Sequence, residues 1–274
     1  MKIMSLNVNR FSGMKDRDYT NSFTELDECP KANEIIALVQ GFLLGCPDGV
    51  VFLHEVPFWI WSKKHKNWIG ERELYQKFCS RFSVKCYKIY KPVQPGVSCT
   101  LAIVKADSTW EPQEGFKPFK KKKEDETDFS DKKNYPTFYE NKFIELTNQG
   151  LRVLGIHAPW QKEKINNSIT VFFDALKEYT KAQISSEGFI VVGDLNADTI
   201  STSTYHKTLE HIENIGYTLP VKEHGAVITN FRNKTRIDHA LVCPTLKSRT
   251  TVQVILRDEL ELSDHAVIIV TIDE

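Results

Sequence analysis

The stretch Gly188–Asp198 constrains this chain most, because it joins a buried strand directly to a group of short polar side chains. Residues 189–192 form a continuous apolar run rich in β-branched side chains, which is typical of a strand buried on both faces. Three polar side chains follow Gly193 closely: Asp194, Asn196 and Asp198. Carboxylate and amide oxygens at a strand end suit a hard metal ion, but Asp and Asn are also ordinary turn residues. The stretch alone leaves both interpretations open.

Further apolar runs along the chain mix with segments of helical periodicity. Strands are predicted at 1–8, 50–53, 84–90, 99–104, 143–146, 151–156, 189–192, 236–242, 251–256 and 266–272. Helices are predicted from Pro30 to residue 43, over 71–82, over 163–184 and over 204–215. The strict alternation of a doubly wound fold is missing. The pattern therefore favours a layered α/β or α+β sandwich, in which sheets pack together under flanking helices.

The chain length sets the domain organisation. With 274 residues, 41% of them hydrophobic, the chain can bury a sizeable core, and it has no internal repeat of fixed period. We therefore expect one domain over 1–274. The region from about 113 to 140 lacks periodicity and carries the basic run Lys120–Lys123, followed by the acidic residues 124–126. This region is predicted to be a long solvated loop inserted in the domain.

Composition narrows the class of protein. The formal net charge is zero, so attraction for phosphate must come from local patches or from a bound cation. The six cysteines include no Cys-x-x-Cys pair and mostly lie among apolar neighbours, which argues against a zinc site or a disulfide framework. No apolar run is long enough to span a membrane, and no signal-peptide pattern follows Met1. We therefore expect a cytoplasmic protein.

Compact polar signatures stand at the ends of several predicted strands or beside them. They comprise Asn7 and Asn9, Glu55, His157, Asp194 with Asn196, Asp238 with His239, and Ser263-Asp264-His265. Because the strands of a sheet lie side by side, their ends can meet at one mouth. Carboxylates, histidines and amides gathered there would suit a hard cation, a water to be activated and a proton donor for a leaving oxygen.

Together these signatures resemble the motifs of the endonuclease/exonuclease/phosphatase superfamily. The matching motifs are Leu6-Asn7-Val8-Asn9, His54-Glu55, Ile156-His157-Ala158-Pro159, Gly193-Asp194-Leu195-Asn196, Arg236-Ile237-Asp238-His239 and Ser263-Asp264-His265. Each motif is commonplace by itself, but the six run in the family's order over nearly the whole chain. The resemblance implies an α+β fold of four layers, with two mixed β-sheets packed face to face and helices outside. It also implies divalent-metal-dependent cleavage of phosphate esters.

The resemblance carries a role to each matched residue. The implied metal ligands are Glu55, as the main magnesium ligand, with Asn7, Asn9 and Asp264; manganese could replace magnesium. The implied catalytic residues are His265, Asp194, Asn196, His157 and Asp238. Among them, Asp194 would align or deprotonate the attacking water, and Asp238 would fix the tautomer of His265. The implied contacts to substrate phosphate are Asn7, Asn196, His157 and His265.

Some positions depart from the family's pattern. In the deoxyribonuclease branch a glutamate supports the residue that His157 matches, but the corresponding place here, near Ser98–Thr100, has no carboxylate. Lys234-Thr235 stands where abasic-site enzymes have an aromatic residue, which argues against a dedicated abasic-site role. Asp198 has no counterpart and is interpreted as a turn residue, and His239 is interpreted as structural.

The sequence thus predicts a magnesium- or manganese-dependent phosphodiesterase, a nuclease for which DNA is favoured over RNA as the nucleic-acid substrate. Two alternatives stay open. One is a hydrolase of a small or lipid phosphate ester, like a sphingomyelinase or an inositol phosphatase, and the other is a non-enzymatic relative that only binds. The aromatic and basic segment Pro57–Trp68 is expected to rim the site, where a tryptophan could stack on a base, meet a lipid or pack into the core.

Overall fold

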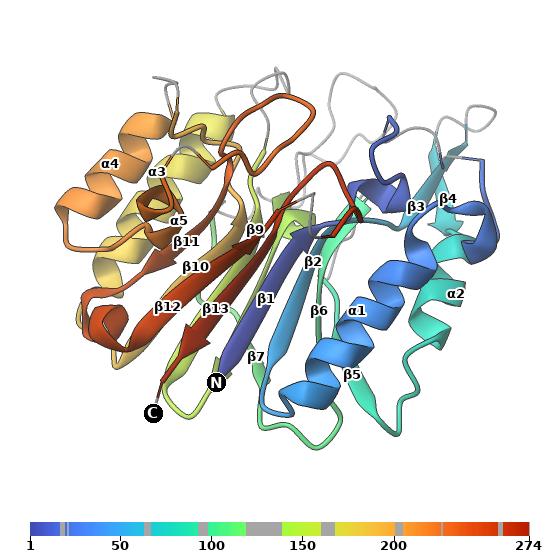
Figure 1. Ribbon diagram of the computed structural model, residues 1–274, viewed down its shortest axis with the longest axis horizontal. Coiled ribbons are helices and arrows are strands. Elements are labelled where there is room, and N and C mark those ends of the chain that lie inside the picture. The colour runs from blue at the N-terminus through green and yellow to red at the C-terminus, as the bar shows by residue number, and fades with distance from the viewer. Residues whose placement is uncertain are drawn as a thin grey trace, which may run out of the picture.

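Two β-sheets packed face to face form the centre of the molecule, and helices cover their outer sides (Figure 1). This computed structural model describes residues 1–16, 20, 22–62, 67–92, 98–118, 139–159, 168–200, 205–225, 227–256 and 260–273. The arrangement is the α+β, four-layer sandwich that the sequence predicts, so the predicted fold class is confirmed.

The first sheet has six strands in the order β12-β13-β1-β2-β6-β5. Their bounds are Thr250–Ile255, Val267–Ile272, Lys2–Asn7, Val50–Pro57, Ser98–Lys105 and Tyr87–Tyr90, in that order. Strands β1 and β2 run parallel, with Asn7 paired to His54, and the other described pairs are antiparallel. The sheet is therefore mixed, and its one described parallel pair lies near the middle.

The second sheet has five strands in the order β11-β10-β9-β8-β7. Their bounds are Asp238–Val242, Gly188–Asp194, Leu151–His157, Phe143–Asn148 and Glu111–Gln113, in that order. The β8–β9 hairpin turns at Gln149 and Gly150, both at positive φ, as two-residue hairpin loops that match strand twist require. Strands β9 and β10 run parallel, with His157 paired to Asp194. This sheet is thus mixed in the same way as the first.

Helices α1 (Ala32–Gly45) and α2 (Glu73–Ser80) pack on the outer side of the first sheet. Helices α3 (Ser168–Ala182) and α4 (His206–Asn214) cover the second sheet, with the short α5 (Pro220–Glu223) next to β11. The buried positions of α1 follow helical spacing: Ile35, Ile36, Val39 and Leu43. One apolar cluster fills the space between the sheets and under α3, and a second lies under α1 and α2.

The structure adds short elements that periodicity did not reveal. The segment after Glu55 forms a hairpin of β3 (Trp59–Ser62) and β4 (Asn67–Glu71), although the side chains of its tryptophans lie outside the described residues. Gln113, predicted to begin the charged loop, belongs to β7 and pairs with β8. The stretch 119–138, with its lysine run, and Trp160 also lie outside the described residues. None of the described helices is long and apolar enough to cross a membrane.

Candidate active site

The two parallel strand pairs bring their carboxyl ends to the same region, one pair from each sheet. Asn7 ends β1 and Glu55 lies near the end of β2, whereas His157 ends β9 and Asp194 ends β10. Side chains at the carboxyl ends of parallel strands point into a common crevice in open α/β sheets. Here the crevice opens at the junction between the two sheets, so each sheet supplies about half of the site.

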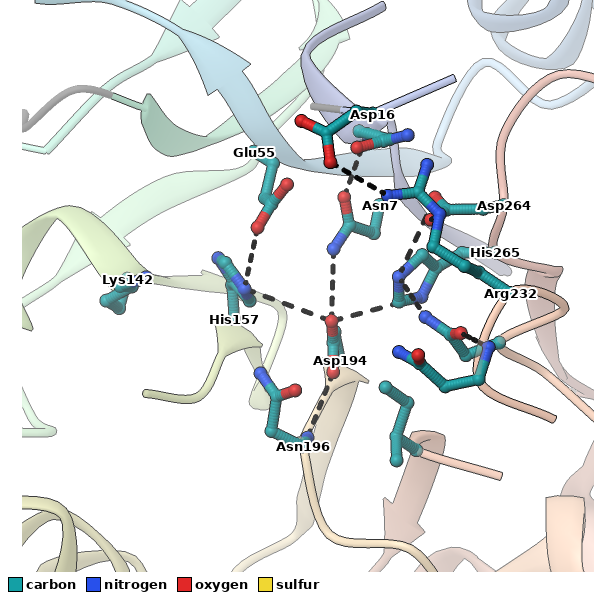
Figure 2. A pocket seen from close by; sticks show the side chains of 14 residues that line it. Asn7, Asp16, Glu55, Lys142, His157, Asp194, Asn196, Arg232, Asp264 and His265 are labelled. Atoms are coloured by element: carbon teal, nitrogen blue, oxygen red, sulfur yellow. Dashed lines mark hydrogen bonds and ion pairs between the residues drawn. The ribbon is translucent and has the colours of Figure 1, made fainter. Parts of the chain in front are cut away.

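A pocket of about 280 Å³ occupies this junction (Figure 2). Every predicted site residue except Asp238 lines it: Asn7, Asn9, Glu55, His157, Asp194, Asn196, Asp264 and His265. The lining also includes Ile237, from the motif that carries Asp238, and residues outside every motif: Asp16, Lys142, Asn230, Arg232 and Asn233. Residues from both ends of the chain therefore meet in one cavity, as the order of the motifs led us to expect.

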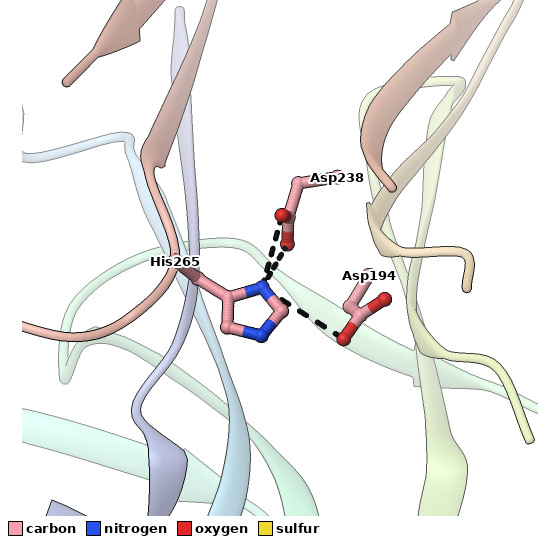
Figure 3. Close-up of side chains that lie close together, drawn as sticks. All are labelled: Asp194, Asp238 and His265. Carbon is pink, nitrogen blue, oxygen red and sulfur yellow. Dashed lines mark hydrogen bonds and ion pairs between the residues drawn. The ribbon is translucent and has the colours of Figure 1, made fainter. Parts of the chain in front are cut away.

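His265 is held by Asp238 across the junction of the sheets (Figure 3). Its Nδ1–H donates to the carboxylate, with Oδ1 at 3.0 Å and Oδ2 at 2.9 Å. Burial alone would disfavour the imidazolium, but Asp238, Asp194 and Asp264 outweigh it and raise the pKa of His265 to about 10. A cationic ring placed in this way can stabilise negative charge that develops on a phosphate.

Asn230 contacts the other ring nitrogen of His265. Its Nδ2 lies 2.9 Å from Nε2, and the backbone N–H of Asn233 donates to its Oδ1 at 2.8 Å, which turns the amide nitrogen toward the ring. An amide N–H directed at Nε2 favours an unprotonated Nε2. The nearby carboxylates of Asp238, Asp194 and Asp264 favour a second proton on the ring, at Nε2. We take the carboxylates as the stronger influence, because charge–charge interactions in a buried site exceed one neutral hydrogen bond. The amide would then turn to accept from Nε2–H.

Asp194 lies at the centre of the site and is almost fully buried. Its Oδ2 accepts from Asn7 Nδ2 at 3.0 Å, and its Oδ1 accepts from the backbone N–H of Asn196 at 2.9 Å. Burial, reinforced by Asp238, raises the pKa of the Asp194 carboxyl to about 7 despite the opposing charge of His265. A carboxylate with a pKa near neutrality is suited to accept a proton from water.

Glu55 supplies the carboxylate that sequence comparison did not find beside His157. Glu55 Oε1 lies 3.4 Å from His157 Nε2, and Asp194 Oδ2 lies 3.9 Å from the same nitrogen. Near Ser98–Thr100, where a glutamate would stand in the deoxyribonuclease branch, the Thr100 hydroxyl instead forms a hydrogen bond with the His54 ring, at 3.1 Å. The place near Ser98–Thr100 has no carboxylate, as the sequence indicated, but Glu55 supplies one beside His157. The contact comes from the neighbouring strand of the other sheet, which sequence position alone does not reveal.

The backbone conformation of the strand ends directs the polar side chains. Glu55 has φ +56° at the irregularity in the β2–β6 pairing, and Asn196 has φ +47°. Asn196 Nδ2 donates to Ala158 O at 2.7 Å, which ties the turn after β10 to the end of β9. Asn9, at φ +44°, donates through Nδ2 to Gly13 O and Lys15 O. The amide nitrogen of Asn9 thus holds its own loop, while that of Asn7 orients Asp194.

Arg232 joins the wall of the pocket to the N-terminal loop. Its Nε lies 3.2 Å from Asp264 Oδ2, its Nη1 lies 3.9 Å from Asp16 Oδ2, and its Nη2 donates to Lys15 O. Burial raises the pKa of Asp264, and the charges of His265 and Arg232 oppose that rise. The turn that carries Arg232 is docked by backbone bonds, including Phe231 N to Asp264 O at 2.8 Å. Because no motif includes residues 230–233, only their contacts with residues 264 and 265 show that they belong to the site.

Two polar residues within or next to the motifs, His239 and Asp198, bond backbone groups around them. His239 is fully buried and donates through Nε2 to Ala197 O and Arg236 O, at 3.1 and 2.9 Å. Burial lowers its pKa to about 4, so the ring is neutral. Asp198 accepts from the backbone N–H groups of Ile200 and Arg236, both at 3.0 Å. Neither residue lines the pocket, which agrees with the structural interpretations given to both.

Two sets of side chains could hold a cation. Asp194, Asp238 and His265 each offer a ligand atom, and these atoms lie within 4.8 Å of one another. However, the imidazolium of His265 carries a proton on each ring nitrogen, so neither nitrogen can bind a cation in that state. The carboxylate of Glu55 lies on the other side of Asn7 and Asp194 and lines the open pocket (Figure 2). Its oxygen donors suit Mg²⁺ better than an imidazole does.

The structure is similar to a 3′-5′ exonuclease, NExo, from Neisseria meningitidis, with 17% identity, 100% of both chains covered and a TM-score of 0.63. It is also similar to an AP endonuclease from Archaeoglobus fulgidus, with 15% identity, 100% of both chains covered and a TM-score of 0.59. A third similar structure is a humanized TDP2 from D. rerio, with 15% identity and a TM-score of 0.52. The match covers 100% of this chain and 99% of the TDP2 chain.

All three structures have the fold of the endonuclease/exonuclease/phosphatase superfamily. At these identities the likeness establishes the fold, and this chain therefore has the fold of that class of proteins, as its motifs predicted. No protein-family model matches the sequence, and no curated protein matches it. The resemblance to that superfamily thus rests on six short motifs and on the fold, rather than on overall sequence similarity.

Proposed function

We propose that this protein is a divalent-metal-dependent phosphodiesterase and that its substrate is DNA. One observation carries the proposal: Asn7, Glu55, His157, Asp194 and His265 converge on one pocket from opposite sheets. A base, a cationic ring and a proton donor placed around a single cavity are the groups that hydrolysis of a phosphodiester requires. The DNA substrate is supported by the names of the similar structures, one of which is NExo bound to a product DNA hairpin.

The charge of the pocket supports a metal requirement. Its lining carboxylates are Asp16, Glu55, Asp194 and Asp264, and its lining cations are Lys142, Arg232 and the imidazolium of His265. The carboxylates of Glu55 and Asp194 lie 3.4 and 3.9 Å from His157 Nε2, where they would repel phosphate unless a bound cation offset their charge. Magnesium, with manganese as a substitute, fits the oxygen donors of Glu55 and Asn7, and Asp264 and Asn9 line the same pocket. When bound, such an ion supplies Lewis-acid stabilisation of charge on phosphate oxygens.

The protein groups would act in an in-line displacement. Water attacks phosphorus, and its proton passes to the Asp194 carboxylate as the new P–O bond forms. The imidazolium of His265, held by Asp238, stabilises the charge on the phosphate oxygens, and the free N–H of the Asn196 amide donates to one of them. The bond to the leaving oxygen breaks as His157 Nε2 gives it a proton, from a position between Glu55 and Asp194.

A substrate panel with matched variants tests the proposal. Single- and double-stranded DNA, RNA, sphingomyelin and inositol polyphosphates would be incubated with Mg²⁺, with chelator, and with chelator followed by excess Mg²⁺. We expect DNA cleavage that chelator abolishes and Mg²⁺ restores. Asp194→Asn should remove the activity, whereas Asp174→Asn, the same change on the exposed face of α3, should not.

The panel also separates the alternatives. Binding through many backbone phosphates weakens steeply with added salt, whereas binding of a small headgroup does not. Cleavage of sphingomyelin or inositol phosphates in preference to DNA, with little salt dependence, would show that DNA is not the substrate. Activity that is unaffected by chelator, or absent on every substrate, would refute the metal-dependent phosphodiesterase itself.

A further inference from the structure

The site lies across the seam between two sheets, so its geometry depends on how the sheets are aligned. Asn7 and Glu55 belong to the first sheet, whereas His157, Asp194 and Asp238 belong to the second. The contacts that link the proposed metal ligands to the proposed base and acid cross this seam: Asn7 to Asp194 and Glu55 to His157. A shift of one sheet over the other would therefore disturb all these contacts together.

Two large side chains of β2 are seated against glycines of the opposite sheet. A Cβ added at Gly155 would come within 2.1 Å of the Phe52 ring, so the ring occupies the space of the missing side chain. A Cβ added at Gly193 would lie 2.8 Å from His54 Nε2 and 1.9 Å from Ile156 O. Because Phe52 and His54 are two residues apart in β2, their side chains lie on the same face and both point across the seam. In an interior packed in this way, a displaced side chain shifts the groups in direct contact with it.

His54 stands directly next to the site on both sheets. It precedes Glu55 in β2, and its partner Gly193 precedes Asp194 in β10. Its ring is fully buried and fixed at both nitrogens, by the Ser5 hydroxyl at 3.0 Å and the Thr100 hydroxyl at 3.1 Å. These hydroxyls come from the strands on either side of β2, so the ring cannot rotate without breaking one of the bonds. Phe52 makes the equivalent contact one pleat deeper, away from the site.

We propose that His54 is a positioning residue: its tethered ring, seated against Gly193, sets the separation of the two sheets at the site. Glu55 is thereby held at contact distance from His157, and Asn7 at hydrogen-bond distance from Asp194. The expected effect on kcat rests on the proposed phosphodiesterase function. The role of His54 in setting the Glu55–His157 and Asn7–Asp194 contacts does not. His54 has no proposed contact with substrate, so its effect is on how well the catalytic groups are aligned, and a misplacement of about 1 Å can lower a rate by about 10²-fold.

Three variants of His54 and one matched control test this inference. His54→Leu keeps a similar volume but loses both hydroxyl partners, and His54→Ala also opens a void. His54→Gln keeps a planar group with one donor and one acceptor. Phe52→Leu alters the deeper seam contact and serves as the control for lost packing. On a small chromogenic phosphodiester with Mg²⁺, we expect kcat to fall by roughly 10- to 100-fold for His54→Leu, with KM within about twofold.

The other variants define what would overturn the inference. Phe52→Leu should lower the unfolding temperature while leaving kcat within about twofold, and His54→Gln should recover most of the lost kcat. If His54→Leu and Phe52→Leu changed kcat equally, His54 would be ordinary core packing. If His54→Leu does not fold, Ser5→Ala and Thr100→Val each remove one of the two hydroxyls that hold the ring. Each should lower kcat. Parental kcat in both variants would contradict the inference.

A structural measurement separates this inference from the proposed function. Crystal structures of the parent and of His54→Leu, or of Thr100→Val if His54→Leu does not fold, would give the Glu55 Oε1 to His157 Nε2 distance, which is 3.4 Å in the parent. We expect the distance to change in the variant. An unchanged distance would overturn the positioning role whether or not the protein cleaves any substrate. A parent without activity on any phosphodiester would refute the proposed function alone.

Discussion

Asp238 accepts a hydrogen bond from Nδ1 of His265 across the seam of the two sheets, at 2.9 and 3.0 Å from its two oxygens. The carboxylate fixes the ring orientation and contributes to the raised pKa of His265. Asp238→Asn keeps the shape but loses the charge, so we expect kcat to fall by roughly 10²-fold or more. Steady-state kinetics on a chromogenic phosphodiester measure this. Parental kcat in a folded Asp238→Asn protein would show that the charge of Asp238 has no part in catalysis.

Asn230 should matter for the rate although no motif contains it. Its amide contacts the ring nitrogen of His265 that faces away from Asp238. Asn230→Ala removes one of the two anchors of the ring, and we expect kcat to fall by about tenfold with KM nearly constant, in line with the loss of about one hydrogen bond. Asn33→Ala, on an exposed part of α1, controls for the loss of an amide. An equal loss of activity in both variants would rule out a specific role for Asn230.

Glu55 should determine the requirement for metal. Glu55→Gln removes a negative charge from the pocket, so the Mg²⁺ concentration that gives half-maximal activity should rise by at least about tenfold. Glu178→Gln, the same change on exposed α3, should leave the metal requirement unaltered. Titration of activity with Mg²⁺, and calorimetric titration with Mn²⁺, measure the effect. A parental metal requirement in Glu55→Gln would place the cation elsewhere, for which the oxygens around Asp194 are the next choice.

Activity should depend on pH in a bell-shaped manner. Asp194 must be ionised to accept a proton, and its pKa is raised to about 7, so kcat/KM should rise about tenfold per unit below that pH. His265 acts as a cation, and its pKa is raised to about 10, so activity should fall above that pH. Residual activity of Asp238→Asn should show the alkaline fall at lower pH, because the carboxylate that supports the cation is gone. A profile that is flat from pH 5 to pH 8 would contradict the assignment of Asp194 as base.

Acid should unfold the protein through its buried neutral histidines. Burial lowers the pKa of His54 to about 3 and that of His239 to about 4, whereas in the unfolded chain both titrate near 6.5. The unfolded state therefore binds more protons between pH 6.5 and those values, and stability is lost as the pH falls through that window. Each histidine should contribute a slope of about 1.4 kcal/mol per pH unit.

Urea denaturation of the parent and of His54→Gln between pH 7 and pH 5 measures this contribution. The glutamine variant should lose stability less steeply than the parent, because one titrating group is gone. Equal slopes in the two proteins would mean that His54 does not take up a proton on unfolding.

Much of the fold followed from local pattern. The strand before Asp194 and the amphipathic spacing of α1 were readable because apolar periodicity reflects the face that each element buries. The β3–β4 hairpin and β7 were not predicted, because short strands depend on the partners that they pair with rather than on their own composition. The same limit applied to Asn230 and Arg232, which reach the pocket only because their turn docks on residues 264 and 265.

The sequence by itself determined which chemical groups the site contains, since motifs at strand ends carry their side chains wherever the strands go. Only the tertiary structure decided how those groups pair. His157 meets Glu55 rather than a residue near Ser98–Thr100, and Asn230, which no motif contains, contacts the ring of His265. The pairing of Asp238 with His265 was already implied by the resemblance, and the structure adds that it joins the two sheets. Such contacts depend on the alignment of two packed sheets, which arises from side chains meeting across the seam, such as His54 and Gly193, and not from the order of residues along either strand.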